Sequence, residues 1–254
     1  MAYSFIPVPS ERAFVERAAE CIQQKITAAE QKDGMCIVGL AGGRTPRGVY
    51  EALGVRLAHR SAKREGGCQV SGVRLWKNLH LFLVDERRVP PKHPESNQRM
   101  VRETFLKHLS VPEAHIVFPN ISLPIDACAA DYTRRLKNMW AERLPHLIIL
   151  GMGTDGHIAS LFPPLSDLAL GDERLVLHTK APEGIGPPDA RDRITLSLNA
   201  ICAANEQLLL LQGEEKKRTW EEMMASTEDE RRWPLKRVIA TGNLTVMRPE
   251  TATA

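Results

Sequence analysis

Three short stretches of the sequence place chemically active side chains directly after apolar runs. The first, LAGGRTPRGVY over residues 40–50, contains Gly42 and Gly43 followed by Arg44 and Thr45. A strand, two glycines and a threonine cap before a proline predict a tight turn into a helix. Backbone N–H groups and the helix dipole would converge on that turn, which favours phosphate binding. An ordinary strand–helix turn is the alternative, because neither the dinucleotide-binding nor the P-loop pattern is present.

The second stretch, VDERRVPPKHPESN over residues 84–97, leaves the next apolar run with four charged residues. Asp85 and Glu86 are acidic, and Arg87 and Arg88 are basic. In an open parallel sheet, ligands bind at the carboxyl ends of the strands, so these side chains could line a site. They could equally pair with one another and have no chemical role.

The third stretch, LIILGMGTDGHIASLFPP over residues 147–164, frames one carboxylate and one imidazole with three glycines. His157 is predicted to start a short helix, whose dipole would help to keep the ring neutral. A neutral imidazole near pH 7 is what a general base requires. Asp155 could orient that ring or a substrate hydroxyl. Zinc binding is the competing interpretation, but no second histidine or cysteine pair lies close in sequence.

The elements that must position these groups alternate along the chain. Apolar runs predict strands at 35–40, 79–84, 146–151, 207–212 and 236–241. Helical patterns lie between them, at 10–32, 46–60, 95–108, 126–143 and 214–225. Most of the strand runs are continuously apolar, as in parallel sheets covered on both faces. The rhythm predicts an open α/β sheet with crossover helices. Segments 175–179 and 193–198 predict a short antiparallel excursion.

The length and the remaining segments limit the organisation of the chain. A chain of 254 residues suits one large domain or two small ones. The polar segment 61–78 is predicted to be a surface loop, and residues 248–254 a disordered tail.

The composition also limits the partners. A net charge of +3 is too mild to indicate nucleic acid, but it fits a small anionic ligand. No apolar run approaches a membrane span, and the first residues lack a secretory pattern. The five cysteines are dispersed, which favours reduced thiols in a cytoplasmic protein. We expect a cytoplasmic monomer with no nucleic-acid or membrane partner.

Taken together, five motifs resemble one known family. LAGGRTP, LVDERRVPPKHPESN, LGMGTDGHIASLFP, RITLSL and GEEK occur in this order. They are similar to those of the 6-phosphogluconolactonases, in the glucosamine-6-phosphate deaminase/isomerase-like superfamily. The resemblance covers about residues 10–242. It implies a Rossmann-like single domain over 1–254, with no metal or organic cofactor. It also implies hydrolysis of 6-phospho-D-glucono-1,5-lactone to 6-phospho-D-gluconate in the oxidative pentose phosphate pathway.

The same resemblance assigns roles to individual residues. His157 would deprotonate the attacking water, Arg87 would stabilise the oxyanion, and Asp155 and Asp85 would position these groups or the sugar hydroxyls. The residues expected to bind substrate or phosphate are Gly42, Gly43, Arg44, Thr45, Asn97, Gly156, Arg193 and Lys216. Family members commonly have serine where this chain has Arg44, so a charged contact to the dianionic phosphate is expected instead.

The sequence also allows comparison with three other functions: a deaminase, a sugar-phosphate sensor and a bare structural domain. The deaminase branch has a tyrosine at the position of Arg87 and a glutamate at that of Phe162, and phenylalanine cannot assist ring opening. A sugar-phosphate sensor would keep the phosphate turn and lose the chemistry, whereas this chain keeps His157, Asp155 and Arg87. A bare structural domain would leave the glycine-framed acid and histidine unexplained.

Overall fold

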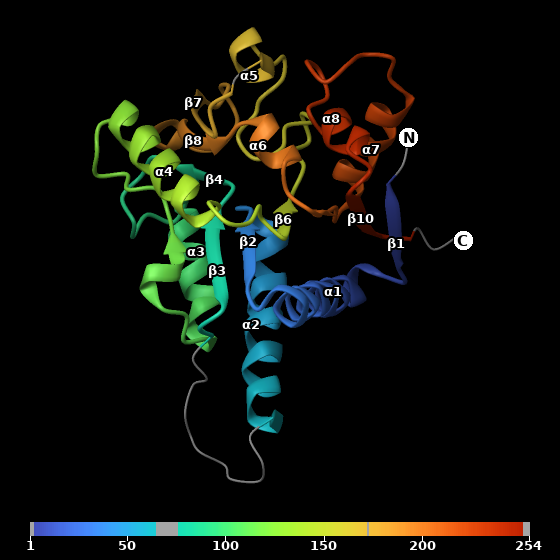
Figure 1. Ribbon diagram of the computed structural model, residues 1–254. Helices are drawn as coiled ribbons and strands as arrows, with labels where there is room; N and C mark the ends of the chain where they lie inside the picture. The colour runs from blue at the N-terminus through green and yellow to red at the C-terminus, as the bar shows by residue number, and fades with distance from the viewer. Residues whose placement is uncertain (1–2, 65–75, 172, 251–254) are drawn as a thin grey trace.

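The main sheet has seven strands, all parallel to their neighbours, in the order β1-β10-β9-β6-β2-β3-β5 (Figure 1). The computed structural model describes residues 3–64, 76–171 and 173–250. The strands are β1 (Ser4–Val8), β2 (Cys36–Leu40), β3 (Leu79–Leu83), β5 (Ile116–Val117), β6 (Leu147–Leu150), β9 (Gln207–Leu210) and β10 (Leu244–Pro249). The predicted α/β fold with a mostly parallel sheet is therefore confirmed.

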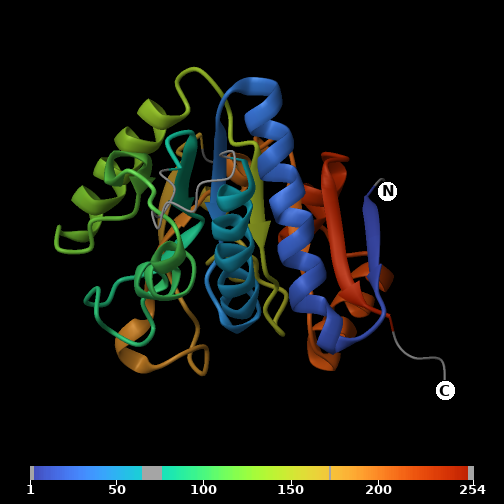
Figure 2. The ribbon, with the colours of Figure 1, turned by 90° about the horizontal axis from the view of Figure 1, so that it is seen from below.

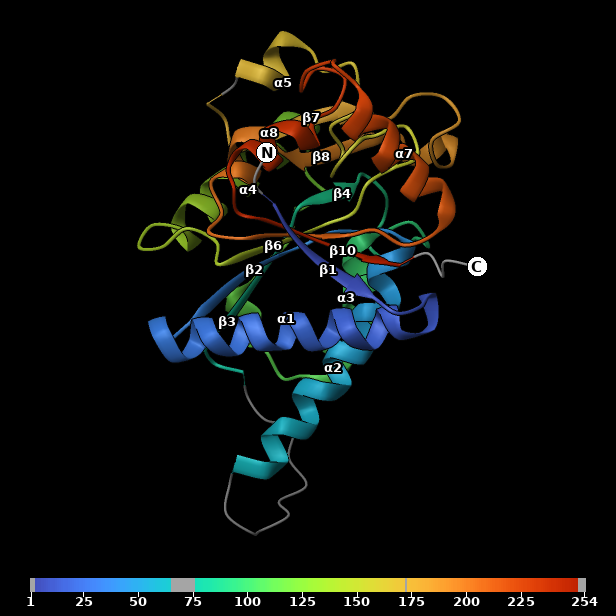
Figure 3. The same ribbon diagram turned by 90° about the vertical axis from the view of Figure 1, so that its right-hand side faces the viewer.

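Helices cover both faces of this sheet, as Figures 2 and 3 show. They are α1 (Glu11–Asp33), α2 (Arg44–Arg64), α3 (Asn97–Thr104), α4 (Ile125–Met139), α5 (Asp167–Gly171), α6 (Leu198–Cys202), α7 (Glu214–Ala225) and α8 (Leu235–Ala240). The apolar residues of α1, α2 and α3 form one core cluster with the sheet, and those of α4, α6, α7 and α8 form another.

Alternation along the strands divides the core between the two faces. Ile37 packs into the cluster under α4, whereas its neighbour Val38 packs into the cluster under α1 and α2. Ile148 and Ile149 divide in the same way. Because successive side chains of a strand point to opposite faces, a continuously apolar run is what a doubly covered strand needs.

A second, smaller sheet lies on the α4 and α7 side of the main sheet (Figure 3). Its order is β4-β8-β7, with β4 (Asp85–Arg87), β7 (Val176–Lys180) and β8 (Asp192–Leu196), and its pairings are antiparallel. The predicted antiparallel excursion is confirmed. Its third strand, β4, was not predicted, and it contains the acidic and basic residues that follow β3.

The order of the main sheet contains one switch point. From β2 the chain proceeds to β3 and β5 on one side, and it returns to β6, β9 and β10 on the other. Crossover connections therefore diverge from the carboxyl ends of β2 and β6, which is where open α/β sheets bind ligands. The glycine turns after these two strands meet at that edge.

The predicted strand at 236–241 is wrong, because this segment belongs to α8. Leu235, Val238 and Ile239 are buried and are spaced three and four residues apart, which places them on one face of a helix. Pro234 immediately precedes the helix. Periodicity in so short a run did not distinguish a strand from a buried helix.

Both ends of the chain contribute strands that were not predicted. Strand β10 pairs with β9 and with β1, and it includes Arg248 and Pro249, so the predicted disorder of 248–254 is wrong at these two residues. Residues 251–254 of the predicted tail lie outside the described residues. The predicted loop at 61–78 is wrong at its start, because α2 continues to Arg64, and residues 65–75 also lie outside the described part.

Candidate active site

A cavity of about 390 Å³ opens at the carboxyl ends of β2 and β6. Nine of the twelve predicted site residues line it: Gly42, Gly43, Arg44, Asp85, Arg87, Asp155, His157, Arg193 and Lys216. Thr45, Asn97 and Gly156 are not among the lining residues. Four of the lining side chains are cationic and two are carboxylates, so the cavity is suited to an anionic ligand.

The Asp155–His157 pair lies on one wall of this cavity. Asp155 Oδ1 is 2.5 Å from His157 Nδ1, so the carboxylate accepts the Nδ1 proton and Nε2 is the ring nitrogen that remains available to accept a proton. Burial acts to raise the pKa of Asp155, but its hydrogen bonds with His157 and the histidine charge outweigh burial and lower it. The carboxylate therefore stays ionised beside the imidazole.

The predicted helix at His157 is wrong. Residues 154–156 form a turn, and Ile158 makes isolated bridges to Met152 and Leu161. No helix begins at His157, and Asp155 fixes the orientation of the ring instead. Gly153 is required at this place, because a Cβ on it would lie 2.3 Å from His157 Cε1. The Phe162 ring packs against the imidazole, with its centroid 4.7 Å away.

Strand β4 presents Asp85 and Arg87 to the same cavity. Ser160 Oγ donates to Asp85 Oδ2 over 2.7 Å. Arg87 Nη1 donates over 2.8 Å to the backbone oxygen of Glu95 and over 2.8 Å to Asn97 Oδ1. Both groups are therefore held by hydrogen bonds before any ligand binds.

Sequence reasoning missed the role of Glu86, which lies between them in β4 and points away from the cavity lining. This buried carboxylate accepts from the backbone N–H of Arg87, Asn97 and Gln98, and so holds β4 against the start of α3. Burial raises the pKa of Glu86 to about 7, against the lowering effect of these three N–H donors. No local pattern signalled this role, because two of these donors lie 11 and 12 residues after Glu86 in the sequence.

The geometry gives Asn97 a positioning role. It is 1% exposed, and its Nδ2 donates to the backbone oxygen of Asp85 over 2.8 Å while its Oδ1 accepts from Arg87. A Cβ on Gly42 would lie 2.1 Å from Asn97 Oδ1, so glycine is needed where the β2–α2 turn passes this side chain. Asn97 thus joins the turn to β4, and its amide is already occupied by protein groups.

The β2–α2 turn differs in detail from the prediction. Helix α2 begins at Arg44, so Thr45 lies in its first turn and is not its cap. Gly43 has φ +104°, a conformation that glycine adopts readily. Lys216 Nζ, from α7, donates to Thr45 Oγ1 over 3.3 Å. Burial and then the charge of Arg44 lower the pKa of Lys216, as expected for two cations that share one site.

Arg193 from β8 is the most buried cation of the cavity. It is 3% exposed, and it lies opposite Arg87 in the β4–β8 ladder. Among the described residues, no group accepts a hydrogen bond from its buried Nη1. Burial and then the Arg87 charge lower the pKa of Arg193. A buried guanidinium N–H without a partner is costly unless a ligand accepts from it.

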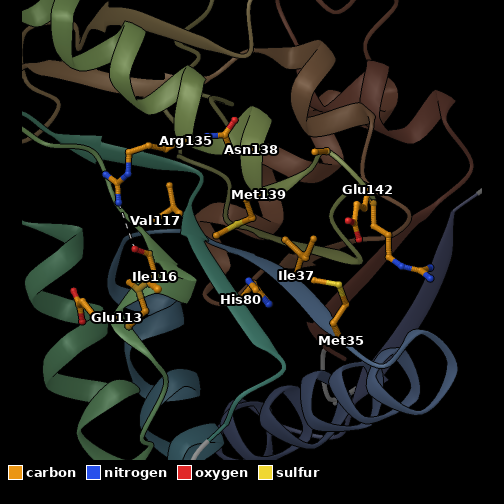
Figure 4. A pocket seen from close by; sticks show the side chains of 13 residues that line it. Met35, Ile37, His80, Glu113, Ile116, Val117, Arg135, Asn138, Met139 and Glu142 are labelled. Carbon is orange, nitrogen blue, oxygen red and sulfur yellow. Dashed lines mark hydrogen bonds between the residues drawn. The ribbon is translucent and has the colours of Figure 1, made fainter.

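A second cavity, of about 590 Å³, lies at the amino-terminal ends of β2 and β3, beneath α4 (Figure 4). Its lining includes Met35, Ile37, His80, Arg135 and Met139. Burial, and then the charge of His115, lowers the pKa of His80 to about 4. The lining offers no carboxylate–imidazole pair, and we therefore place the chemistry in the smaller cavity.

Within the described part of the chain, no group of three or more His, Cys, Asp and Glu side chains could hold a metal, and no helix is long and apolar enough to cross a membrane.

Comparison with known proteins shows the family of this chain. A probable 6-phosphogluconolactonase of Dictyostelium discoideum is 30% identical over 97% of this chain and 98% of its own. A 6-phosphogluconolactonase of Synechocystis is 32% identical over 92% and 90%. The crystal structure of 6-phosphogluconolactonase from Thermotoga maritima superposes with a TM-score of 0.75 and 27% identity, over 97% of this chain and 99% of that one. The model of the glucosamine-6-phosphate isomerase/6-phosphogluconolactonase family matches residues 9–247, and the chain belongs to this family.

Proposed function

We propose that this protein hydrolyses 6-phospho-D-glucono-1,5-lactone to 6-phospho-D-gluconate, as the 6-phosphogluconolactonases that it resembles do. One observation carries the proposal. A carboxylate-bound imidazole and four cationic side chains face the same cavity, and one of these cations has a buried N–H with no acceptor in the described part of the chain. The substrate needs the same combination, because it has a phosphate at one end and an electrophilic carbonyl at the other.

The chemistry is assigned to His157 and Arg87. His157 Nε2 removes a proton from water, and the resulting hydroxide adds to the lactone carbonyl carbon. Asp155, on Nδ1, stabilises the imidazolium that forms. Arg87 is fixed by Glu95 and Asn97 and provides a preorganised positive charge for the oxyanion. The intermediate then collapses with cleavage of the ring C–O bond, and the imidazolium returns its proton to the departing ring oxygen.

The phosphate is assigned to the β2–α2 turn. The backbone of Gly43 and the start of α2 offer N–H groups, and Arg44 and Lys216 add charge-assisted hydrogen bonds. Arg193 supplies its free Nη1 from the neighbouring wall. Because Arg193 lies opposite Arg87 in the β4–β8 ladder, it connects the phosphate end of the cavity to the reacting end. No metal, organic cofactor or partner chain is needed in this scheme, and we keep the cytoplasmic monomer as the expected state.

The position of Phe162 argues against the deaminase reaction. Its ring lies against His157, where the deaminase pattern has a glutamate. A phenyl ring cannot accept or donate the proton that ring opening of an amino sugar requires.

The test generates 6-phosphogluconolactone in situ and follows its disappearance with wild-type protein, His157→Ala and His178→Ala. His178 is a matched control, because it also pairs with an aspartate, Asp192, but outside the cavity. We expect acceleration by wild type and His178→Ala alone. Acceleration by His157→Ala as well would keep the function and reject the base. If wild type does not accelerate the reaction, the lactonase proposal is wrong, and ammonia release from glucosamine 6-phosphate becomes the next assay.

A further inference from the structure

The turn that carries Asp155 and His157 is held from beneath by two side chains that the proposed mechanism does not use. Thr219 of α7 donates its hydroxyl to the backbone oxygen of Thr154 over 3.1 Å. Arg232, in the connection between α7 and α8, donates Nη1 to the backbone oxygen of Asp155 over 2.9 Å. Neither residue lines the cavity, so neither contacts a ligand bound there.

The Arg232 guanidinium is fixed between the turn and an indole ring. Its Cζ lies 3.7 Å from the centroid of the Trp233 ring, at the distance of a cation–π contact. Trp233 is 1% exposed, and a Cβ on Gly156 would lie 2.6 Å from this ring and 3.1 Å from Arg232 Nη1. The Asp155–Gly156 backbone therefore rests directly on the pair formed by Arg232 and Trp233.

The connection that presents this pair is itself closed by hydrogen bonds. The backbone N–H of Trp233 donates to the Asp229 oxygen over 2.9 Å, and Lys236 Nζ donates to the Ser226 oxygen over 2.6 Å. Helix α7 at its start also carries Lys216 to the β2–α2 turn. Helix α7 and the connection that follows it thus support the turn that carries His157, and α7 also supplies Lys216 to the predicted phosphate site.

We propose that Arg232 is a positioning residue for His157, which acts by fixing the backbone of Asp155. This inference rests on the proposed role of His157 as the base. The Asp155 carboxylate accepts from His157 Nδ1, and the direction of this hydrogen bond depends on where the Asp155 backbone lies. A displacement of the base by about 1 Å can cost on the order of 100-fold in rate.

The adjacent arginine provides a matched control. Arg231 directs its guanidinium away from the catalytic turn, to the backbone oxygen of Leu165 over 2.7 Å and to the carboxylate of Asp167. Arg231→Gln therefore removes the same charge from the same connection without touching Asp155. Arg232→Lys retains a charge and a donor but loses the planar group that stacks on Trp233.

The experiment compares Arg232→Gln, Arg232→Lys and Arg231→Gln with wild type. We expect Arg232→Gln to lower kcat by about 10- to 100-fold with KM nearly unchanged, Arg232→Lys to recover part of the loss, and Arg231→Gln to behave as wild type. The acid limb of the kcat/KM profile should move to lower pH in Arg232→Gln, because a looser carboxylate stabilises the imidazolium less. A proton NMR spectrum should lose the low-field signal of His157 Nδ1–H, identified by its absence in His157→Ala.

The NMR signal does not depend on turnover, so the inference and the proposed function can fail separately. If His157→Ala is inactive while Arg232→Gln keeps the wild-type kcat and low-field signal, Arg232 is not a positioning residue. Equal losses in Arg231→Gln and Arg232→Gln would also overturn the inference, because they would indicate a general effect on the connection. If Arg232→Gln does not fold, Arg232→Lys decides: wild-type kcat together with a wild-type signal would reject the proposal.

Discussion

The Asp155–His157 pair shows what residue types can and cannot predict at the scale of single side chains. An acid and an imidazole two residues apart among glycines left two partners open for Asp155, the ring or a substrate hydroxyl, and in the structure Asp155 binds the ring. The expected reason, a helix dipole at His157, was wrong because the segment forms a turn. The groups that hold this turn, Thr219 and Arg232, lie 65 and 77 residues further along the chain from their acceptors. Such contacts are set by tertiary packing and leave no local signal.

Replacing Lys216 should affect substrate binding more than the chemical step. In Lys216→Ala, we expect KM for the lactone to rise by about 10- to 100-fold, from the ~1.5–3 kcal/mol of a charged hydrogen bond, with a smaller change in kcat. The reason is that contacts to the phosphate exist before and within the transition state alike. Initial rates over a range of substrate concentrations measure both constants.

The control for this variant is Lys217→Ala on the same helix. Lys217 Nζ lies 3.9 Å from Glu214 and 4.0 Å from Glu221. Lys217 does not line the cavity. It should leave both constants unchanged. A large fall in kcat with an unchanged KM in Lys216→Ala would contradict the assignment of Lys216 to the phosphate.

At the scale of elements, strong patterns were predicted well and short ones were not. Helix α7 has the predicted bounds, and Ser10 caps α1 as the sequence indicated. Strands β1 and β10 have polar or exposed positions, and their pairing joins the two ends of the chain, so no local run identified them. Strand β4 has three charged residues and exists because β8 pairs with it. Tertiary pairing decided these cases over propensity.

Replacing Gly156 tests how the turn that carries His157 depends on its packing against Trp233. Its φ is +89°, and a Cβ would overlap the Trp233 ring. Gly156→Ala should therefore lower the free energy of unfolding by about 1–3 kcal/mol from overpacking, in addition to the backbone strain. It should also lower kcat, because the turn carries His157. Urea denaturation and steady-state kinetics measure the two effects.

Gly242→Ala separates the clash from the backbone strain. Gly242 has φ +76°, but a Cβ there would meet nothing within 4 Å. We expect it to show only the cost of the positive φ, about 1 kcal/mol, with normal kcat. Equal destabilisation in the two variants would mean that contact with Trp233 contributes nothing.

At the scale of the whole molecule, the site forms where the strand order reverses, because the turns after β2 and β6 lie at the same edge of the sheet. These two turns both follow strands of one parallel sheet, and the carboxyl ends of parallel strands share one edge, where ligands bind. Motif order alone could not predict how β4 and β8 place Arg87 opposite Arg193, or how α7 brings Lys216 to Thr45. These contacts depend on the packing of the small sheet and α7 on the same face of the main sheet.

Two titrating groups at opposite ends of the sheet have opposite effects on stability. The pKa of His80 is lowered from 6.5 to about 4, first by burial and then by His115. Between pH 6.5 and about 4 the unfolded chain thus binds more protons than the folded one, so the free energy of unfolding decreases as the pH falls through this range. Burial raises the pKa of Glu86 from 4.5 to about 7, so the folded state binds more protons there and stability is lost as the pH rises. The pH dependence of wild-type stability therefore contains both contributions and does not separate them.

Replacing His80 separates these contributions. In His80→Gln, the acid-side loss should disappear, so the free energy of unfolding relative to wild type should increase steadily as the pH falls from 6.5 towards 4. Urea denaturation in small pH steps measures this difference, and Glu86 cancels because both proteins contain it. His59 is exposed and does not line this cavity, so His59→Gln controls for the replacement of a histidine as such. A constant offset for His80→Gln would mean that the cavity under α4 does not keep this imidazole neutral.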